Sequence, residues 1–232
     1  MYSIHFGNNY TGQQGALSQC QADAKKLRSW VKFKYQNPQT RLLLDQKKNR
    51  MLRHMWRGVK RANRAARKYG KFSLWITYSG HGSWIRDKSG DEADGRDEVL
   101  VPHDYAKKGF ITDDTLARIL ARLDARVRCY VVMDCCHSGT VLDLPYKLSG
   151  RTQDSKHQNF KARIICISAC QDSEVAYEVS TGGVLTSTLL KTLGRSKNLT
   201  LEELWAGLSK MTGQRPLLTC SKPMKSTENL FV

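Results

Sequence analysis

Short apolar runs alternate with longer amphipathic stretches along most of this chain. Apolar residues recur at every second position over residues 2–6, and nearly continuous apolar runs follow at 42–44, 72–78, 131–133 and 163–168. Such runs, bounded by polar or glycine-containing segments, predict β-strands. Since helical patterns separate most of them, the order of elements favours an α/β fold with a mostly parallel central sheet and helices on both faces.

Helical periodicity accounts for the stretches between the strands. Apolar side chains recur three or four positions apart in five segments, which are residues 17–31, 46–69, 112–123, 184–193 and 199–211. Thr112 is a suitable N-cap for the third segment. We expect a last strand, at the edge of the sheet, over Leu217–Cys220 after Pro216, and a polar linker over residues 149–161.

Length and composition favour one folded intracellular domain. A chain of 232 residues buries one substantial core, and 40% apolar and 25% charged residues are ordinary for a folded protein. An odd number of cysteines, seven, is scattered through apolar runs and does not resemble a disulfide framework. The sequence contains neither a signal-peptide pattern nor a run of eighteen apolar residues. We therefore expect an intracellular, cytoplasmic protein that does not enter a membrane.

The formal net charge of +17 is unusual, and much of it lies on one predicted helix. The basic residues of that helix are Lys47, Lys48, Arg50, Arg53, Arg57, Lys60, Arg61, Arg64, Arg67 and Lys68. A basic amphipathic helix can bind phosphates, but such a face is often only solvated, and no groove-reading motif accompanies it. Nucleic acid is therefore a possible partner that no sequence motif supports.

Two of the predicted strands end in residues that can perform nucleophilic chemistry. Residues 131–133 run into Asp134, Cys135 and Cys136, and residues 72–78 run into Ser79, Gly80 and His81. Carboxyl ends of strands in an open α/β sheet are where ligands bind. A thiol is mostly protonated at pH 7, and a neighbouring imidazole can accept its proton. The pair suggests a cysteine hydrolase, although buried structural cysteines and a polar loop histidine would give the same pattern.

An acidic stretch follows His81 between residues 87 and 98. Its carboxylates repel one another unless water separates them or a hard cation such as Ca²⁺ neutralises them. The spacing does not fit an EF-hand, because Gly90 and Val101 would occupy ligand positions. By itself the stretch is therefore a weak calcium signal, since acidic loops are usually only solvated.

Three motifs, taken in order, resemble those of the type I metacaspases, which are caspase-clan cysteine peptidases. They are Tyr78-Ser79-Gly80-His81-Gly82-Ser83, the stretch from Gly90 to Glu98, and the stretch from Asp134 to Pro145. The resemblance implies a caspase-like sandwich, with Cys136 as the nucleophile and His81 as the general base and acid. The interval between the two also fits the caspase signature, in which the histidine lies about 50 residues upstream.

Further site residues are implied by this resemblance alone. Family members cleave after Arg or Lys, and the positions that match the acidic specificity pocket are Cys20, Asp23, Ser79 and Asp134. Without the resemblance, Cys20 is a core thiol and Asp23 a first-turn acid that suits the helix dipole. The family's Ca²⁺ site maps to Asp97, Asp113, Asp114 and Asp143.

The resemblance also implies one monomeric peptidase domain over residues 1–232. We expect this domain to lack a prodomain, because no Pro/Gln-rich or zinc-finger segment precedes it, which is a departure from the family pattern. A large-subunit-like region over 1–148, a linker over 149–162 and a small-subunit-like region over 163–232 would make it up. Our main hypothesis is a calcium-dependent endopeptidase that cleaves protein or peptide substrates after Arg or Lys. The alternative is a catalytically silent caspase-like scaffold or regulator that binds nucleic acid or protein through its basic helix.

Overall fold

A computed structural model describes most of the chain. The described residues are 1–36, 38–86, 95–135, 142, 144–148, 150–151, 159–169, 178–179, 182–196 and 198–231. Cys136 and Asp143, two of the predicted site residues, lie outside them. Much of the acidic stretch between 87 and 98 and of the linker between 149 and 162 also lies outside.

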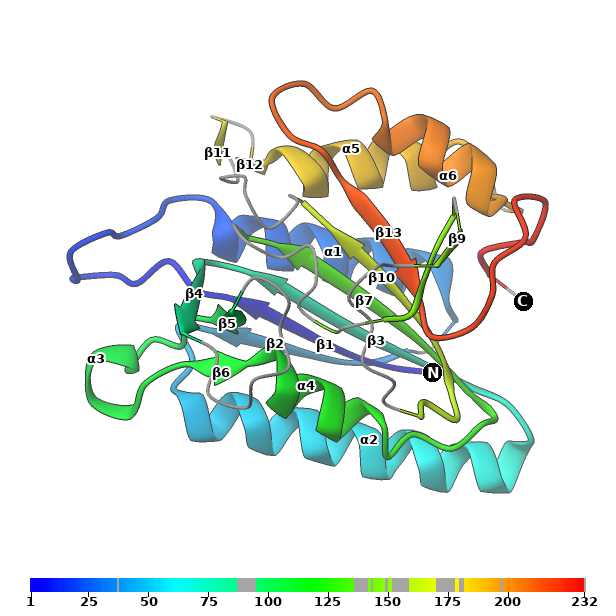
Figure 1. Cartoon of the computed structure of the whole chain (residues 1–232), viewed down its shortest axis with the longest axis horizontal. Coiled ribbons are helices and arrows are strands. Elements are labelled where there is room, and N and C mark those ends of the chain that lie inside the picture. The colour runs from blue at the N-terminus through cyan, green and yellow to red at the C-terminus, as the bar shows by residue number, and fades with distance from the viewer. Residues whose placement is uncertain are drawn as a thin grey trace.

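An eight-stranded sheet, in the order β2-β1-β3-β7-β10-β13-β8-β9, forms the centre of the described structure (Figure 1). Its first five strands are parallel: β2 Gln39–Leu44, β1 Tyr2–Gly7, β3 Phe72–Ser79, β7 Val127–Asp134 and β10 Arg163–Ser168. The last three pair antiparallel: β13 Leu217–Cys220, β8 Tyr146–Lys147 and β9 Gly150–Arg151. This confirms the predicted mostly parallel sheet.

The predicted position of one strand in the sheet was wrong. Leu217–Cys220 is a strand, as expected, but it lies between β10 and β8 and is not at the edge. Strands β8 and β9, which lie beyond it in the sheet, have two residues each. Strands this short have no alternating pattern from which they could be predicted. Strand β9 also places part of the expected linker in the sheet.

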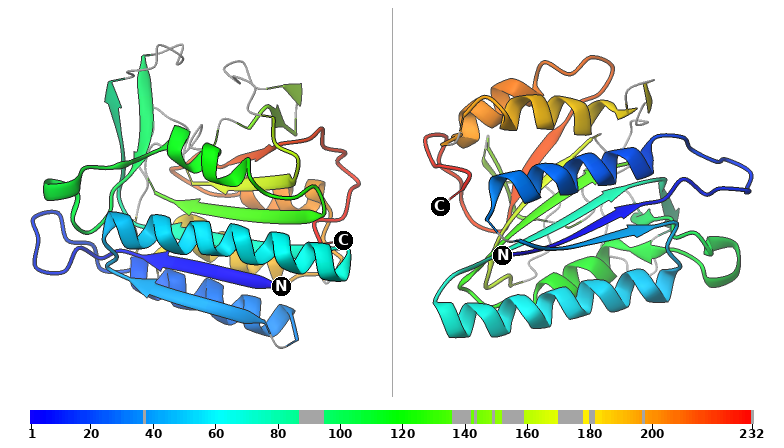
Figure 2. Two further views of the ribbon diagram at one scale, coloured as in Figure 1. Left: turned by 90° about the horizontal axis from the view of Figure 1, so that it is seen from below. Right: turned by 180° about the vertical axis from the view of Figure 1, so that it is seen from behind.

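Helices cover both faces of the sheet, as Figure 2 shows from two further directions. Helices α2 (Lys48–Tyr69) and α4 (Asp113–Leu120) lie on one face, and α1 (Cys20–Lys34), α5 (Val184–Leu193) and α6 (Leu201–Leu208) on the other. Two apolar clusters follow from this layering: one contains Met51 and Met55 of α2, and the other contains Leu27 of α1 and Leu189 of α5. Burial of these faces is the main stabilising contribution to such a layered fold.

The predicted helices form; α5 has the predicted bounds, and the other four have shifted ends. Thr112 caps α4, as expected, by accepting a hydrogen bond from the Thr115 N–H. Helix α1 begins at Cys20 and not at Leu17, because the preceding residues form a loop in which Gly12 and Gly15 both have φ of +79°. No helix in the described part of the chain is long and apolar enough to cross a membrane.

A small antiparallel sheet stands beyond the end of β3. It consists of β4 (Gly82–Arg86), β5 (Arg96–Leu100) and β6 (Ile111–Thr112), with the short helix α3 (Tyr105–Lys108) between β5 and β6. Strand β4 was not predicted from the sequence, because its two apolar residues, Trp84 and Ile85, are adjacent and do not alternate with polar ones. A two-strand hairpin, β11 (Glu178–Val179) with β12 (Gly182–Gly183), precedes α5.

Candidate active site

Strands β3 and β7 are neighbours and end at the same level. Ser79 pairs with Asp134 in the parallel register, and the Gly80 N–H donates to the Asp134 carbonyl oxygen at 3.4 Å. His81 and Cys136 are each the second residue beyond this pair, so the chain leaves the sheet at the same edge on the way to both. Cys136 itself lies outside the described residues.

His81 is held by atoms of three residues, two from the loop before α1 and one from the end of β3. Its Nε2 lies 2.7 Å from the Gly15 carbonyl oxygen. A carbonyl only accepts hydrogen bonds, so Nε2 carries the hydrogen and Nδ1 keeps the lone pair in the neutral ring. The backbone N–H of His81 donates to Tyr10 Oη at 2.9 Å, and its carbonyl accepts from Tyr78 Oη at 2.7 Å. This arrangement leaves Nδ1 as the basic atom of the imidazole.

Two buried tyrosines support this histidine. The Tyr10 ring lies 4.8 Å from the His81 ring, and its Oη donates to the Val101 carbonyl at 2.7 Å. Burial raises the pKa of both Tyr10 and Tyr78 above the ordinary value of a phenol, so both remain protonated donors.

The loop that carries Tyr10 and Gly15 is anchored to the end of β2. Asp45 Oδ1 accepts hydrogen bonds from the N–H groups of Asn9, at 2.7 Å, and Tyr10, at 2.9 Å. Tyr10 and Asp45 both have positive φ, 54° and 47°, which costs free energy in residues other than glycine. Sequence reasoning missed these supporting residues, and the only signal was the pair of glycines in an otherwise polar loop.

The predicted acidic pocket is partly assembled around Gly183. Asp23 and Asp134 are 1% and 7% exposed. The Gly183 N–H donates to Asp23 Oδ2 at 2.8 Å, and a Cβ at Gly183 would collide with the Asp134 carboxylate. Thr186 donates to Asp134 Oδ2 through its N–H, at 3.0 Å, and its hydroxyl, at 2.6 Å. The structure therefore brings two buried carboxylates to one glycine, which the sequence analysis did not assign to the site.

Cys20 and Ser79 lie next to these carboxylates along the ends of the strands. Gly7, the last residue of β1, pairs with Ser79, and a Cβ at Gly7 would lie only 2.6 Å from the Cys20 carbonyl oxygen. Cys20 is 5% exposed and Ser79 is 1% exposed. Among the described residues, Ser79 Oγ has no hydrogen-bond partner. A buried hydroxyl of this kind is suited to bind a polar group that enters the site.

Asp97 and Asp113, from the small sheet and the start of α4, form a separate buried acidic pair. They are 9% and 2% exposed. Burial, together with the nearby charge of Asp97, raises the pKa of Asp113 to about 6. Its carboxylate accepts the N–H groups of Glu98, at 2.8 Å, and Asp114, at 2.6 Å. Repulsion between two buried carboxylates fits a place that a cation would stabilise.

Within the described residues these acids do not by themselves complete a metal site. No group of three or more His, Cys, Asp or Glu side chains there is arranged to hold an ion. Asp143, the fourth predicted ligand, lies outside that part of the chain. The three described members of the predicted set thus supply oxygen donors of the right chemistry without a full coordination shell.

Comparison with known proteins identifies a family and relatives that match more than half of this chain. Residues 3–145 match the family described as "Metacaspase, peptidase C14 domain". The chain is 41% identical over 149 residues to Metacaspase-1B of Neurospora crassa, which covers 62% of this chain and 35% of that protein. It is also 41% identical over 152 residues to Metacaspase-1 of Botryotinia fuckeliana, over 63% of this chain and 36% of that protein. The matched region thus spans about a third of these relatives.

Solved structures support the fold over nearly the whole chain. A crystal structure of a Geobacter sulfurreducens protein superimposes with a TM-score of 0.72 at 23% identity and covers 98% of this chain and 96% of that one. Caspase-1 from Spodoptera frugiperda gives a TM-score of 0.52 at 12% identity, over 99% of this chain and 87% of the caspase. The caspase-like architecture, the histidine placed beside the end of β7 and the family match over more than half of the residues lead to one conclusion: this chain belongs to the metacaspase family of cysteine peptidases.

Proposed function

We propose that this chain is a calcium-dependent cysteine endopeptidase that cleaves after Arg or Lys. The observation that carries the proposal is the pairing of Ser79 with Asp134 at one sheet edge, where two buried carboxylates lie. Ser79 and Asp134 stand two positions before His81 and Cys136 in the sequence. The family match supports the peptidase class. The specificity, the dyad and the use of calcium are inferences from the residues of this chain.

In the proposed reaction, His81 Nδ1 accepts the proton of the Cys136 thiol. The resulting thiolate attacks the carbonyl carbon of the scissile bond, and the C–N bond breaks as His81 returns the proton to the leaving amine. Water, deprotonated by the same imidazole, then hydrolyses the thioester and regenerates the thiol. The hydrogen bond from Nε2 to Gly15 supports this role because it fixes the ring while Nδ1 stays available.

The preference for Arg or Lys follows from the charge of the pocket. A cationic side chain that leaves water needs a carboxylate partner, and Asp23 and Asp134 provide two. The Ser79 hydroxyl, which has no hydrogen-bond partner among the described residues, lies beside them. Both carboxylates are already oriented by hydrogen bonds from Gly183 and Thr186. Preorganised acceptors of this kind favour a guanidinium, which can bind two of them at once.

Calcium is proposed to act at Asp97, Asp113, Asp114 and Asp143. The ion would supply positive charge that offsets the repulsion between buried carboxylates and would link β5 to the start of α4. Because β5 pairs with β4, which begins directly after His81, ordering this sheet would also help to position the imidazole.

The decisive experiment measures hydrolysis of fluorogenic peptides that differ only in the residue before the scissile bond. We expect cleavage after Arg and Lys, none after Asp, and loss of activity in chelator. Cys136→Ala should abolish hydrolysis, whereas Cys135→Ala, which removes the adjacent thiol, should retain it. Asp134→Asn should lower kcat/KM for the arginyl peptide by about 100-fold or more, since a buried cation would lose its partner.

Two results would overturn the proposal. Unchanged hydrolysis by Cys136→Ala would remove that thiol from the mechanism. Absence of hydrolysis at every calcium concentration, with the folded state verified by circular dichroism, would instead favour a silent caspase-like scaffold.

A further inference from the structure

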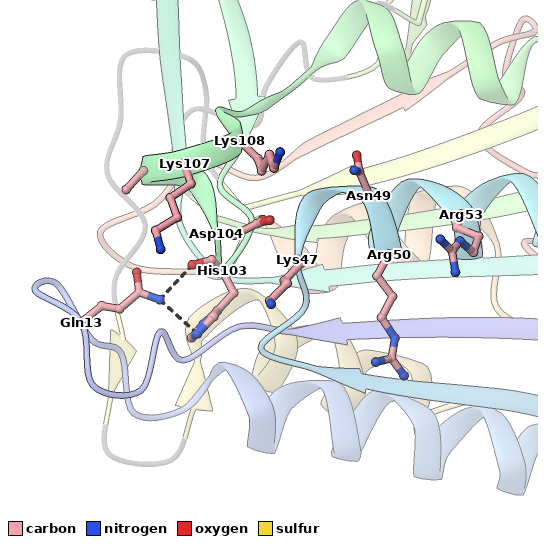
Figure 3. Close-up of a pocket in the computed structure, with 10 residues that line it drawn as sticks. Gln13, Lys47, Asn49, Arg50, Arg53, His103, Asp104, Lys107 and Lys108 are labelled. Carbon is pink, nitrogen blue, oxygen red and sulfur yellow. Dashed lines mark hydrogen bonds between the residues drawn. The ribbon is translucent and has the colours of Figure 1, made fainter.

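A cavity of about 640 Å³ lies between the start of α2 and the short helix α3, apart from the acidic pocket (Figure 3). Five basic side chains line it, and the only acid among the lining residues is Asp104. The basic residues are Lys47, Arg50, Arg53, Lys107 and Lys108. In Figure 3, Lys47 and Lys107 extend toward Gln13 and His103 on the opposite wall.

These five cations are not neutralised by the described part of the protein. All five are exposed, and none takes part in the salt bridges formed among the described residues. The single acid is already engaged, because Asp104 Oδ1 accepts the N–H of Lys48 at 2.7 Å and so caps the start of α2. Like charges gathered around one hollow repel one another unless an anion joins them.

Two further features add to the positive potential of the cavity. Helix α2 is 22 residues long, and its N-terminal end, where the helix dipole is positive, forms one wall. His54, on the next turn, has a lowered pKa, first because of burial and then because of Arg50, Arg57, Arg41 and Arg53. The arginines of this region therefore act on a neighbouring side chain as an electrostatic group.

We propose that this cavity binds a small anion that carries several phosphate groups, such as tripolyphosphate or the triphosphate of a nucleotide. Lysine and arginine side chains near a helix N-terminus are the usual partners of phosphate oxygens. The volume is that of a small-molecule site. A nucleic acid would be expected to follow the exposed row of Arg57, Lys60 and Arg64 farther along α2, and none of these lines the cavity.

The experiment is calorimetric titration of the full chain with sodium tripolyphosphate, ATP and adenosine, at low salt and in chelator. Chelator is needed because polyphosphates bind calcium, and the readout does not depend on peptidase activity. We expect one tripolyphosphate per chain and no binding of adenosine. Equal affinities for ATP and tripolyphosphate would assign recognition to the phosphates alone, whereas at least tenfold tighter binding of ATP would identify a nucleotide site.

Matched variants test the location. The triple variant Lys47→Gln, Arg50→Gln, Arg53→Gln should weaken tripolyphosphate binding at least tenfold. The control Arg57→Gln, Lys60→Gln, Arg64→Gln removes three exposed charges from the same helix and should change it less than threefold. Lys107→Gln with Lys108→Gln, on α3, should again weaken it and covers the case in which the first variant fails to fold.

Three outcomes would overturn the proposal. The first is the absence of tripolyphosphate binding to the wild-type chain. The second is an equal loss of affinity in the two triple variants, which would indicate a diffuse positive field. The third is binding of a DNA duplex with steep salt dependence but not of tripolyphosphate, which would assign the basic face to nucleic acid.

Discussion

Tyr10 joins the loop before α1, the start of β4 and the end of β5 through one oxygen atom. Its Oη accepts the His81 N–H at 2.9 Å and lies 2.7 Å from the Val101 carbonyl and 3.0 Å from Tyr78 Oη. The residue is 1% exposed, so no water can easily replace it. The backbone of the proposed base therefore depends on a phenol 71 positions away in the sequence.

Tyr10→Phe should impair catalysis more than substrate binding. The substitution leaves the half-buried His81 N–H without its acceptor, a cost of roughly 1–3 kcal/mol, so we expect kcat to fall roughly tenfold or more with KM nearly unchanged. Steady-state hydrolysis of an arginyl peptide provides the measurement. Tyr69→Phe, at a residue that is 67% exposed, is the control. A proportional rise in KM alone would contradict a positioning role.

The sequence was sufficient to predict the residues that carry the chemistry but not the residues that hold them in position. Asp134 was recognisable because it directly follows an apolar run, and His81 because it follows another after Ser79 and Gly80. The Gly15 carbonyl, Tyr10 and Asp45 act through backbone geometry and positive φ, and neither leaves a pattern in composition or periodicity. Gly183 belongs to the same class, since its role is to let the Asp134 carboxylate approach the backbone.

Helices α5 and α6 pack closely against each other at Gly207. Gly207 of α6 faces Thr192 of α5, and a Cβ at Gly207 would collide with the Thr192 side chain, which is 1% exposed. Helix α5 also continues directly from Gly183 at the acidic pocket. The contact between these helices therefore supports one wall of the site.

Gly207→Ala should destabilise the fold. The added methyl group overfills the α5–α6 contact, which typically costs about 1–3 kcal/mol and outweighs the gain of up to about 1 kcal/mol in helix propensity. Urea unfolding measures the change. Gly194→Ala is the matched control, because Gly194 has φ of −76° and its nearest atom to a new Cβ is 3.4 Å away. Equal stabilities of the two variants would show that the close contact between Gly207 and Thr192 does not affect the stability of the fold.

Element boundaries were predictable where the pattern is strong and local. The strand over Arg163–Ser168 and the helix over Val184–Leu193 have the predicted bounds, because a continuous apolar run and a glycine pair define them. The position of Leu217–Cys220 in the sheet was not predictable, since it depends on strands of two residues that pair far away in the sequence.

The acidic pocket unites distant parts of the whole molecule. Asp23 and Gly183 are 160 positions apart, on either side of the linker over 149–162, and their hydrogen bond is 2.8 Å long. Asp134 lies on the first side as well and binds Thr186 on the second. The pocket therefore requires both regions to be packed together, whether or not the chain is cut between them.

Calcium would likewise join separate elements, because Asp97 lies in β5 of the small sheet and Asp113 and Asp114 at the start of α4. Asp113 is buried with a raised pKa, so in the absence of an ion its charge opposes folding. A cation that binds only the folded state stabilises it by mass action, by about 2.7 kcal/mol at a calcium concentration 100 times the Kd. Calcium should therefore raise the unfolding temperature of the wild-type chain.

Asp113→Asn separates this site from a general effect of the ion. In chelator the variant should be at least as stable as the wild type, because the buried charge has been removed, and in calcium it should gain little or nothing. Asp124→Asn is the control: Asp124 pairs with Arg126 at 2.8 Å, outside the proposed ligand set, so this variant should keep the full calcium increment. Thermal unfolding of the three proteins, each with calcium and with chelator, provides the measurement. Equal increases in unfolding temperature in all three proteins would mean that calcium acts elsewhere. Asp97, Asp113 and Asp114 would then have a structural role and would not bind a metal.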